Sequence, residues 1–460
     1  MKKIHFIAIG GSAMHSLALV LNQSGYEISG SDDTIFEPSY SKLKAAGLLP
    51  DEMGWFPKKI NGGLDCVILG MHAQMDNPEL IAAQKLKIKI QSYPEILAHY
   101  FREKTRVVIA GSHGKTTITS MILHVLKYHD KKVDFMVGAP VKGLDQTLSI
   151  DDSTDFALIE GDEYLSSPLD KKSKFLWYRP QIALITGIAW DHVNVFPSFE
   201  DYAKTFEDFI LSLSEGGVLF YNETDPVLKN LVEKTSHPIK KIPYQIPNYE
   251  IESGQTYWIT QEGNLPLPFF GAHNLLNANG ARWILQLMGI DAIDFYEAIS
   301  SYRGAAKRLE LLAKGESAML FKDFAHAPSK VRASVQAVVN QFKKHRIIAC
   351  FELHTYSSTD PKFVEQYKSV FDGIDQAVVY YDRAALKLKK RLLPEKDQIK
   401  KAFGRNDMLV IDEVLELENI FMQDLKYTIL LMMSSGNFGG LQWSDLSKSC
   451  LLYTSDAADE

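Results

Sequence analysis

The fold is decided by one stretch of the chain, Arg106–Leu126, which reads RVVIAGSHGKTTITSMILHVL. Its first five residues, in which four apolar residues follow Arg106, predict a β-strand, and residues 118–126 show a helical pattern. The turn between them, Gly111–Thr117, contains Gly-Lys-Thr, the working end of a phosphate-binding loop. In such a loop, backbone N–H groups cradle phosphates, the lysine reaches the terminal phosphates and the threonine hydroxyl ligates Mg²⁺. The stretch therefore predicts a nucleotide site at the edge of a parallel sheet.

Short apolar runs alternate with helical patterns over most of the chain, which is typical of βαβ units and parallel sheets. We predict a long helix after Ser198, a hairpin near Tyr257–Pro266 and a helix from Ser329. The predicted strands are Ile4–Ile9, Glu27–Ser29, Cys66–Leu69, Ile88–Ile90, Arg106–Ala110, Phe156–Glu160, Ile182–Thr186, Gly217–Tyr221, Met319–Asp323, Ile347–Phe351, Ala377–Tyr381, Met408–Ile411 and Thr428–Met433.

Length indicates the number of domains, and composition excludes some classes of protein. The 460 residues (51.8 kDa) correspond to about three domains. With 46% hydrophobic and 23% charged residues, the chain is typical of globular proteins and not of disordered ones. Its net charge of −7 disfavours bulk nucleic-acid binding, which depends on phosphate neutralisation.

Two polar stretches, residues 99–104 and 301–306, separate the predicted sets of strands. They divide the chain into an N-terminal domain (1–103), a central domain (104–304) and a C-terminal domain (305–448). Residues 449–460 continue no pattern, and we interpret them as a tail that is not native sequence.

Cysteine usage and the termini indicate a reduced, cytoplasmic protein. Cys66, Cys350 and Cys450 lie far apart, so neither a disulfide framework nor a structural zinc site is predicted. The apolar run at the N-terminus is shorter than that of a signal peptide and ends in a glycine turn. No stretch approaches the roughly 20 apolar residues of a membrane span.

A second glycine turn, Ala8–Ala13, follows the first predicted strand and contains Gly10, Gly11 and Ser12. Glycines at such a turn let the backbone approach a phosphate at a helix N-terminus. Asp32 follows at about the distance of a ribose-binding carboxylate. The glycine turn with Asp32 fits a nicotinamide-dependent dehydrogenase. It also fits a strand–helix turn that binds no ligand.

Acidic residues follow two central strands at the edge where open α/β sheets bind ligands. Glu160, Asp162 and Glu163 end one strand, and Asp191 and His192 follow another. Since Mg²⁺ prefers oxygen ligands, these residues are candidates for a metal site beside the phosphate loop.

Together these motifs resemble the Mur ligase family of peptidoglycan synthesis. Further resemblances are Gly271–Ala278 (GAHNLLNA), Lys307–Glu310 (KRLE) and Asp323–Pro328 (DFAHAP), and the motifs occur in the family's order. The resemblance implies an α/β fold of three domains: an N-terminal Rossmann-like domain, a central phosphate-loop ATPase-like domain with a mostly parallel sheet, and a C-terminal Rossmann-like domain.

The resemblance also implies an enzyme that joins a carboxylic acid to an amine through an acyl phosphate, with ATP and Mg²⁺ as cofactors. The implied catalytic residues are Lys115, His192, Arg308 and His326. The implied ATP-binding residues are Gly111, Ser112, His113, Gly114, Lys115, Thr116, Thr117, Asn274, Asn277, Arg308 and Asp323. The implied metal ligands are Thr116, Glu163 and His192, and the implied UDP-sugar site contains Gly10, Gly11, Ser12 and Asp32.

Two branches of the family resemble this chain at the N-terminus, and both act on UDP-N-acetylmuramate. One adds L-alanine, and the other adds the tripeptide L-alanyl-γ-D-glutamyl-meso-diaminopimelate. Gly161–Tyr164, Lys172–Pro180 and Ser434–Gly440 resemble the tripeptide branch, whereas Gly10–Ser12 resembles the alanine branch. We expect the tripeptide, with L-alanine as the alternative, and only small-molecule partners: no nucleic acid, no membrane and no obligate protein.

Two other function classes stay open at this stage. A dehydrogenase would use the first glycine turn but leaves the Gly-Lys-Thr turn unexplained. An ATP-binding regulator would keep the phosphate loop but would not need Asp323 or His326.

Overall fold

The computed structural model describes residues 2–141, 143–190, 195–304, 308–315, 318–355, 357–388, 395–421, 425–444 and 446–447. The chain divides into two compact units. Unit 1 comprises Met1–Trp190, Asn194–Gln245 and Gly280–Ala298, and unit 2 comprises Asp191–Val193, Ile246–Asn279 and Ile299–Glu460.

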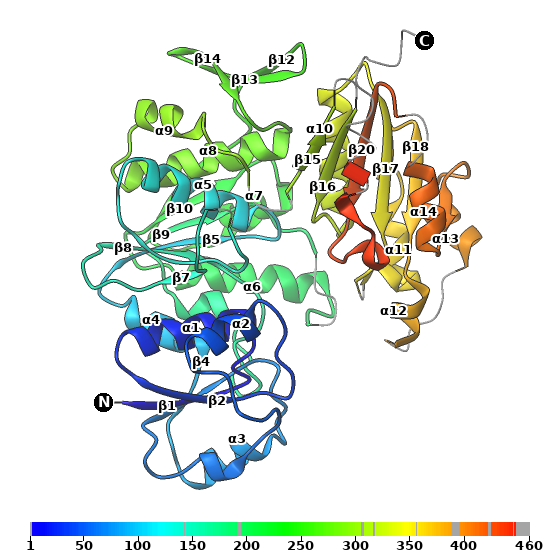
Figure 1. Ribbon diagram of the computed structural model, residues 1–460. Coiled ribbons are helices and arrows are strands. Elements are labelled where there is room, and N and C mark those ends of the chain that lie inside the picture. The colour runs from blue at the N-terminus through cyan, green and yellow to red at the C-terminus, as the bar shows by residue number, and fades with distance from the viewer. Residues whose placement is uncertain are drawn as a thin grey trace. The chain divides into compact units, whose positions relative to one another are not determined.

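Unit 1 begins with a parallel sheet of four strands in the order β2-β1-β3-β4 (Figure 1). Every residue of β3 is buried, which explains why its sequence is a continuous apolar run. The elements of this region are β1 (Lys3–Ile7), α1 (Ser12–Gln23), β2 (Glu27–Ser31), α2 (Ser39–Ala45), β3 (Cys66–Leu69), α3 (Pro78–Lys85), β4 (Ile90–Ser92) and α4 (Tyr93–Tyr100).

The second sheet of unit 1 has seven strands in the order β11-β10-β9-β5-β8-β6-β7. Its strands are parallel except β7, which runs antiparallel to β6. The central strand β5 pairs with β8 and β9, so the turn that follows it lies at the middle of the sheet's carboxyl edge. The strands are β5 (Thr105–Ala110), β6 (Asp134–Met136), β7 (Leu148–Ser149), β8 (Phe156–Glu160), β9 (Ile182–Ile185), β10 (Val218–Asn222) and β11 (Lys240–Tyr244).

Helices accompany this sheet, and two of them, α6 and α7, begin with a side-chain cap. For example, Ser198 caps α6, since its side chain accepts a hydrogen bond from the Asp201 N–H at 3.1 Å. The helices are α5 (Lys115–Tyr128), α6 (Phe199–Ser212), α7 (Pro226–Lys234), α8 (Ala272–Leu287) and α9 (Ala292–Ile299); α8 continues from unit 2 into unit 1.

Unit 2 contains a small antiparallel sheet and a six-stranded sheet. The small sheet consists of β12 (Tyr249–Glu252), β13 (Gln255–Thr260) and β14 (Gly263–Leu267). The larger sheet has the order β15-β16-β20-β17-β18-β19, and β15 is its antiparallel edge. Its strands are β15 (Glu310–Lys314), β16 (Met319–Asp323), β17 (Arg346–Glu352), β18 (Gln376–Tyr380), β19 (Leu409–Ile411) and β20 (Thr428–Met433).

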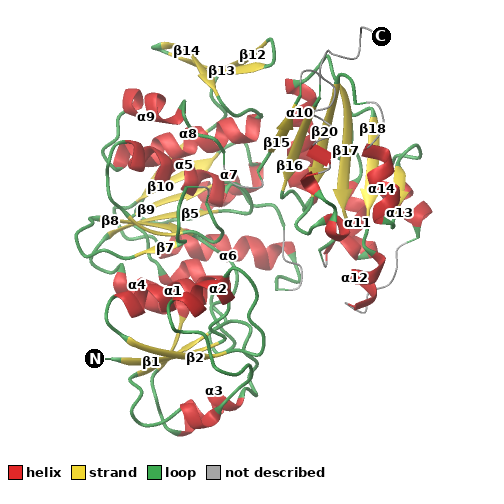
Figure 2. Ribbon diagram, in the orientation of Figure 1, coloured by secondary structure: helices red, strands yellow, loops and turns green. Residues whose placement is uncertain are grey.

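Helices cover both faces of the six-stranded sheet (Figure 2). Along β17, Ile347, Ala349 and Phe351 belong to one buried cluster, and Ile348 and Cys350 belong to another. Because successive side chains point to opposite faces, a strand buried on both sides reads as an unbroken apolar run. The helices are α10 (Pro328–Gln341), α11 (Pro361–Val364), α12 (Arg383–Leu388), α13 (Lys396–Phe403) and α14 (Val414–Phe421).

The predicted elements agree with the structure wherever the apolar signal is strong. The bounds of β3, β8, β16 and β20 are those predicted, and the hairpin is confirmed as β13–β14. The prediction of a strand over Ile88–Ile90 was wrong by two residues, since β4 is Ile90–Ser92. The first strand ends at Ile7 and not at Ile9, because Ala8 has a positive φ of 67°.

The strands that the sequence did not predict are short or polar, such as β7 and β12. The predicted division into three domains stays a prediction. The predicted tail, residues 449–460, lies outside the described residues, as does Cys450, whereas Cys66 and Cys350 are buried free thiols. In the part of the chain that the structure describes, the helices are too short or too polar to span a bilayer.

Candidate active site

The phosphate loop joins β5 to α5 and depends on two glycines. Gly111 and Gly114 have φ values of +118° and +80°, a region that side chains rarely adopt. A Cβ at Gly111 would lie 2.1 Å from the Thr186 Oγ1 and 2.8 Å from the Thr186 nitrogen. The close approach of β9's end to the loop therefore requires glycine at this position.

Residues after β9 hold the loop in place. The Thr186 hydroxyl donates to the His113 carbonyl at 2.5 Å, and the Ser112 N–H donates to the Gly187 carbonyl at 3.0 Å. The Ala189 N–H in turn donates to the Ser112 hydroxyl at 2.8 Å. These contacts make the loop a pre-formed cradle.

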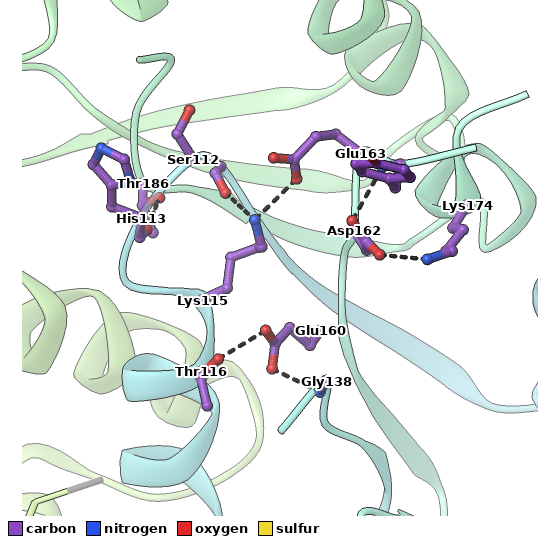
Figure 3. Close-up of polar contacts among 12 residues, drawn as sticks. Ser112, His113, Lys115, Thr116, Gly138, Glu160, Asp162, Glu163, Lys174 and Thr186 are labelled. Atoms are coloured by element: carbon purple, nitrogen blue, oxygen red, sulfur yellow. Dashed lines mark hydrogen bonds and ion pairs between the residues drawn. The ribbon is translucent and has the colours of Figure 1, made fainter. Parts of the chain in front are cut away.

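Lys115 points toward strand-end carboxylates (Figure 3). Its Nζ donates to the Gly111 carbonyl at 2.5 Å and lies 2.9 Å from Oε2 of Glu163. The two side chains are only 15% and 1% exposed. Burial alone would lower the pKa of Lys115, but Glu163, Asp162 and Glu160 outweigh it, so that the pKa is raised and the lysine keeps its positive charge.

Thr116, one of the implied metal ligands, contacts the carboxylate of Glu160. The structure brings its hydroxyl to Glu160, where it donates to Oε1 at 2.8 Å (Figure 3). The Gly138 N–H donates to the other oxygen of Glu160 at 3.0 Å. Burial raises the pKa of Glu160, although Gly138 and Lys115 oppose this rise. Glu160 is therefore a candidate metal ligand, as expected for the carboxylates at this strand end, although the family resemblance assigned no role to it.

The donors beside the loop fit Mg²⁺ by their chemistry. Thr116, Glu160 and Glu163 supply hydroxyl and carboxylate oxygens, and Mg²⁺ takes few protein ligands when phosphates and waters supply the rest. In the described part of the chain, no three His, Cys, Asp or Glu side chains are arranged to hold a metal by themselves. His192, the third predicted ligand, lies outside the described residues.

Tyr202 is a site residue that the sequence analysis missed. Its side chain is 0% exposed, its hydroxyl lies 2.9 Å from Ser112 Oγ, and it donates to Oε1 of Glu163 at 3.1 Å. The helical pattern after Ser198 predicted the helix α6 but gave no signal that this side chain reaches the loop. Asp162, by contrast, pairs with Lys174 at 2.6 Å and supports the loop after β8.

In the N-terminal turn, Gly10 contacts Asp32, and the resemblance assigned both residues to the UDP-sugar site. The Gly10 N–H donates to Oδ2 of Asp32 at 2.7 Å, and Asp32 is buried. Burial raises the pKa of Asp32, partly offset by this hydrogen bond. Helix α1 begins at Ser12, after Gly11, so the turn leads directly into a helix N-terminus. A helix N-terminus of this kind suits an anionic ligand.

In unit 2, Asp323 organises the predicted C-terminal residues. Its carboxylate accepts the N–H groups of Leu309 at 2.7 Å and Ala325 at 2.6 Å. Arg308 stacks over the Phe324 ring, 5.1 Å from its centroid. Burial raises the pKa of Asp323, and Arg308 opposes this rise. The two motifs containing Arg308 and Asp323, which are separate in sequence, are thereby held side by side.

His326 and the first turn of α8 complete the predicted set in unit 2. Nδ1 of His326 donates to the Phe324 carbonyl at 2.8 Å, which fixes the proton on that nitrogen. Asn274 donates to the Phe270 carbonyl at 2.9 Å, and Asn277 is buried on the same helix. Burial, with a smaller effect from Arg308, lowers the pKa of His273 to about 4.

Two family models match this chain. Residues 3–105 match the model described as "Mur ligase family, catalytic domain", and residues 109–285 match "Mur ligase middle domain". A similar protein, the UDP-N-acetylmuramate–L-alanine ligase of Caldicellulosiruptor bescii, is 30% identical over 370 residues, which cover 78% of this chain and 79% of that protein.

Two solved structures share the fold. The murein peptide ligase of Psychrobacter arcticus has a TM-score of 0.64 at 21% identity, with 99% of this chain and 100% of that one covered. The UDP-N-acetylmuramate–alanine ligase of Thermotoga maritima has a TM-score of 0.70 at 20% identity, with 98% of each chain covered.

Proposed function

Because the chain belongs to the Mur ligase family, we propose that it joins the carboxylate of UDP-N-acetylmuramate to the amine of L-alanyl-γ-D-glutamyl-meso-diaminopimelate. The chain is an ATP-dependent ligase that forms amide bonds. The identity of the two joined substrates is the proposal, and so is Mg²⁺ as the metal.

One observation carries the proposal for the ATP half of the reaction. Lys115 is a buried, positively charged side chain that lies between the phosphate-loop backbone and Glu163. When nucleotide phosphates enter the loop, Lys115 exchanges this carboxylate for phosphate oxygens and neutralises charge on the transferred group. Thr116, Glu160 and Glu163 would hold Mg²⁺, which would supply further neutralisation.

The remaining predicted residues receive roles in binding and orientation. Gly10, Gly11 and Ser12 bind the anionic part of the UDP-sugar at the start of α1, and Asp32 holds this turn through its bond to the Gly10 N–H. In unit 2, Asp323 orients the backbone beside Arg308, whose guanidinium is a donor of the kind that binds phosphate oxygens. Exclusion of water protects the acyl phosphate from hydrolysis.

For the amine substrate, separate observations support each candidate. The name of the Caldicellulosiruptor bescii relative supports L-alanine, as does the turn Gly10–Ser12. The sequences around Tyr164, Lys172–Pro180 and Ser434–Gly440 support the tripeptide. We choose the tripeptide because these three stretches include the loop after β20, which lies in the C-terminal part of the chain where the amine is expected to bind.

The test supplies the purified protein with UDP-N-acetylmuramate, ATP and Mg²⁺, together with L-alanine or the tripeptide, and identifies products by mass. We expect the tripeptide adduct with release of ADP and phosphate. If only L-alanine is consumed, the amine assignment is wrong but the ligase reaction stands. If neither amine is consumed, the proposed acid or reaction is wrong.

A further inference from the structure

The carboxyl ends of three neighbouring strands of unit 2 meet at one place. Strand β20 lies between β16 and β17, with Met433 paired to both Asp323 and Phe351. After β20, the Ser434 N–H donates to the Asp323 carbonyl at 2.9 Å. Glu352 is the last residue of β17, so a single strand, β20, separates it from the proposed site residue Asp323.

Glu352 is a buried carboxylate with only one of its oxygens satisfied. Its side chain is 0% exposed. Oε2 accepts the hydroxyl of Ser434 and the N–H of Phe438, the latter at 3.0 Å. Oε1 has no hydrogen-bond partner, and the same holds for the buried hydroxyl of Ser435 within the described residues. A buried carboxylate oxygen without a partner is costly, so a ligand that completes it would bind with a large gain.

The backbone of the loop after β20 approaches this carboxylate closely. A Cβ at Gly436 would lie 2.8 Å from Oε2 of Glu352 and 2.6 Å from Nδ1 of His354. Glycine keeps this space clear, and the Gly436 N–H donates to the Ser434 hydroxyl at 2.6 Å. The loop thus holds the carboxylate rigidly by Oε2 and leaves Oε1 for another group.

The charges around Glu352 favour a cation. In the described part of the chain, its one ion-pair neighbour is His354, whose Nδ1 lies 3.7 Å from Oε1 and whose side chain is 31% exposed. The basic residues Arg383 and Lys396 are themselves paired with Asp412. Rotation of the partly exposed His354 would open Oε1 to a ligand N–H.

We propose that Glu352 binds the non-reacting ammonium group of the amine substrate. This inference rests on the proposed function, and it names the ammonium group of the amine substrate that Glu352 recognises. A reacting amine must lose its proton before it attacks, whereas a buried carboxylate stabilises the protonated form. The carboxylate therefore suits an ammonium that keeps its charge. Diaminopimelate carries such a group at the far end of the tripeptide, and L-alanine has none.

The test compares two peptides that differ only in this ammonium: L-alanyl-γ-D-glutamyl-meso-diaminopimelate and the same peptide with 2-aminopimelate at the third position. For the wild type we expect the KM of the second peptide to be about 10- to 100-fold higher, as for loss of a hydrogen bond to a charged group, with kcat little changed. Glu352→Gln should raise the KM of the first peptide by the same factor and leave that of the second unchanged.

The isosteric variant Glu352→Gln retains an oxygen that can accept hydrogen bonds from Ser434 and Phe438, so the contacts that hold the loop after β20 are kept. Asp375→Asn is the matched control, because Asp375 accepts the Ile347 N–H at 2.7 Å at the opposite end of β17 and should change neither KM. Equal KM values of the two peptides for the wild type would overturn the proposal without any variant, and so would equal effects of Glu352→Gln on both.

Two further outcomes separate this inference from the proposed function. If the wild type couples L-alanine but neither peptide, the ligase reaction stands and the role of Glu352 is wrong. If it couples none of the three amines to UDP-N-acetylmuramate, the proposed function is wrong, and the role of Glu352 that rests on it is wrong as well.

Discussion

We expect Tyr202→Phe to weaken the link between the phosphate loop and Glu163. The variant removes one hydroxyl that lies 2.9 Å from Ser112 Oγ and 3.1 Å from Glu163 Oε1. The phenylalanine ring keeps the edge-to-face contacts with Phe196 and Phe206, at centroid distances of 5.1 and 5.2 Å. The perturbation is therefore confined to hydrogen bonds in a fully buried network.

The magnitude follows from the partners that remain. Ser112 still accepts the Ala189 N–H at 2.8 Å, so the loss falls mainly on the Glu163 carboxylate. A hydrogen bond to a charged group contributes about 1.5–3 kcal/mol to stability. For a unit of this size, that corresponds to a decrease in Tm of about 3–12 °C. A misplaced Glu163 also alters the partner of Lys115, so we expect the Kd for ATP with Mg²⁺ to rise about 10-fold.

The assay combines thermal unfolding with equilibrium titration of ATP, in the presence and absence of Mg²⁺. Tyr178→Phe is the matched control, since the buried hydroxyl of Tyr178 has no hydrogen-bond partner among the described residues. Its removal should leave Tm unchanged or raise it slightly. If Tyr202→Phe and Tyr178→Phe both have the Tm of the wild type and its Kd for ATP, Tyr202 does not position Glu163 and the reasoning fails.

Lys115→Ala should abolish turnover and also lower Tm, because it leaves the 1% exposed Glu163 without its cation; residual ligase activity would remove the phosphate loop from the mechanism. Gly111→Ala should destabilise unit 1 and prevent ATP binding, since the added Cβ would lie 2.1 Å from the Thr186 hydroxyl; a variant with normal Tm and ATP affinity would contradict the loop geometry. Burial lowers the pKa of His273 from its usual 6.5 to about 4, so the unfolded chain takes up a proton before the folded one, and stability is lost as pH falls through this window. His273→Gln should flatten that part of the pH profile of urea unfolding, and an unchanged slope would show that His273 does not cause it.

The strands and turns were predictable because their signals are local. Strand β20 is apolar from Ile429 to Met433 because both of its faces are buried, so its bounds could be predicted from sequence. Strand β12, which reads YEIE and is half exposed, gave no such signal. The phosphate loop could be located from its glycines and Gly-Lys-Thr, since each has a conformational or chemical reason to occupy its position.

The partners of the site residues could be predicted only in part. The motifs predicted carboxylates at the strand ends beside the phosphate loop, where Lys115 meets Glu163, but not the contact between Asp32 and Gly10. They did not predict that Thr116 contacts Glu160, because neighbouring carboxylates after one strand differ in direction and sequence order does not show which one faces the loop. The predicted role of His192 stays a prediction.

The sequence by itself determined the family, the strongly apolar strands and the position of the glycine-rich turn after β5, since each depends on residues that are neighbours in the chain. Only the tertiary structure decided which distant side chains meet. Tyr202 lies 90 residues from Ser112, and Glu352 lies 82 residues from Ser434, yet each pair is hydrogen-bonded. The physical reason is that strand order and helix packing bring chain segments together, and a hydroxyl or carboxylate shows in sequence neither its direction nor its partner.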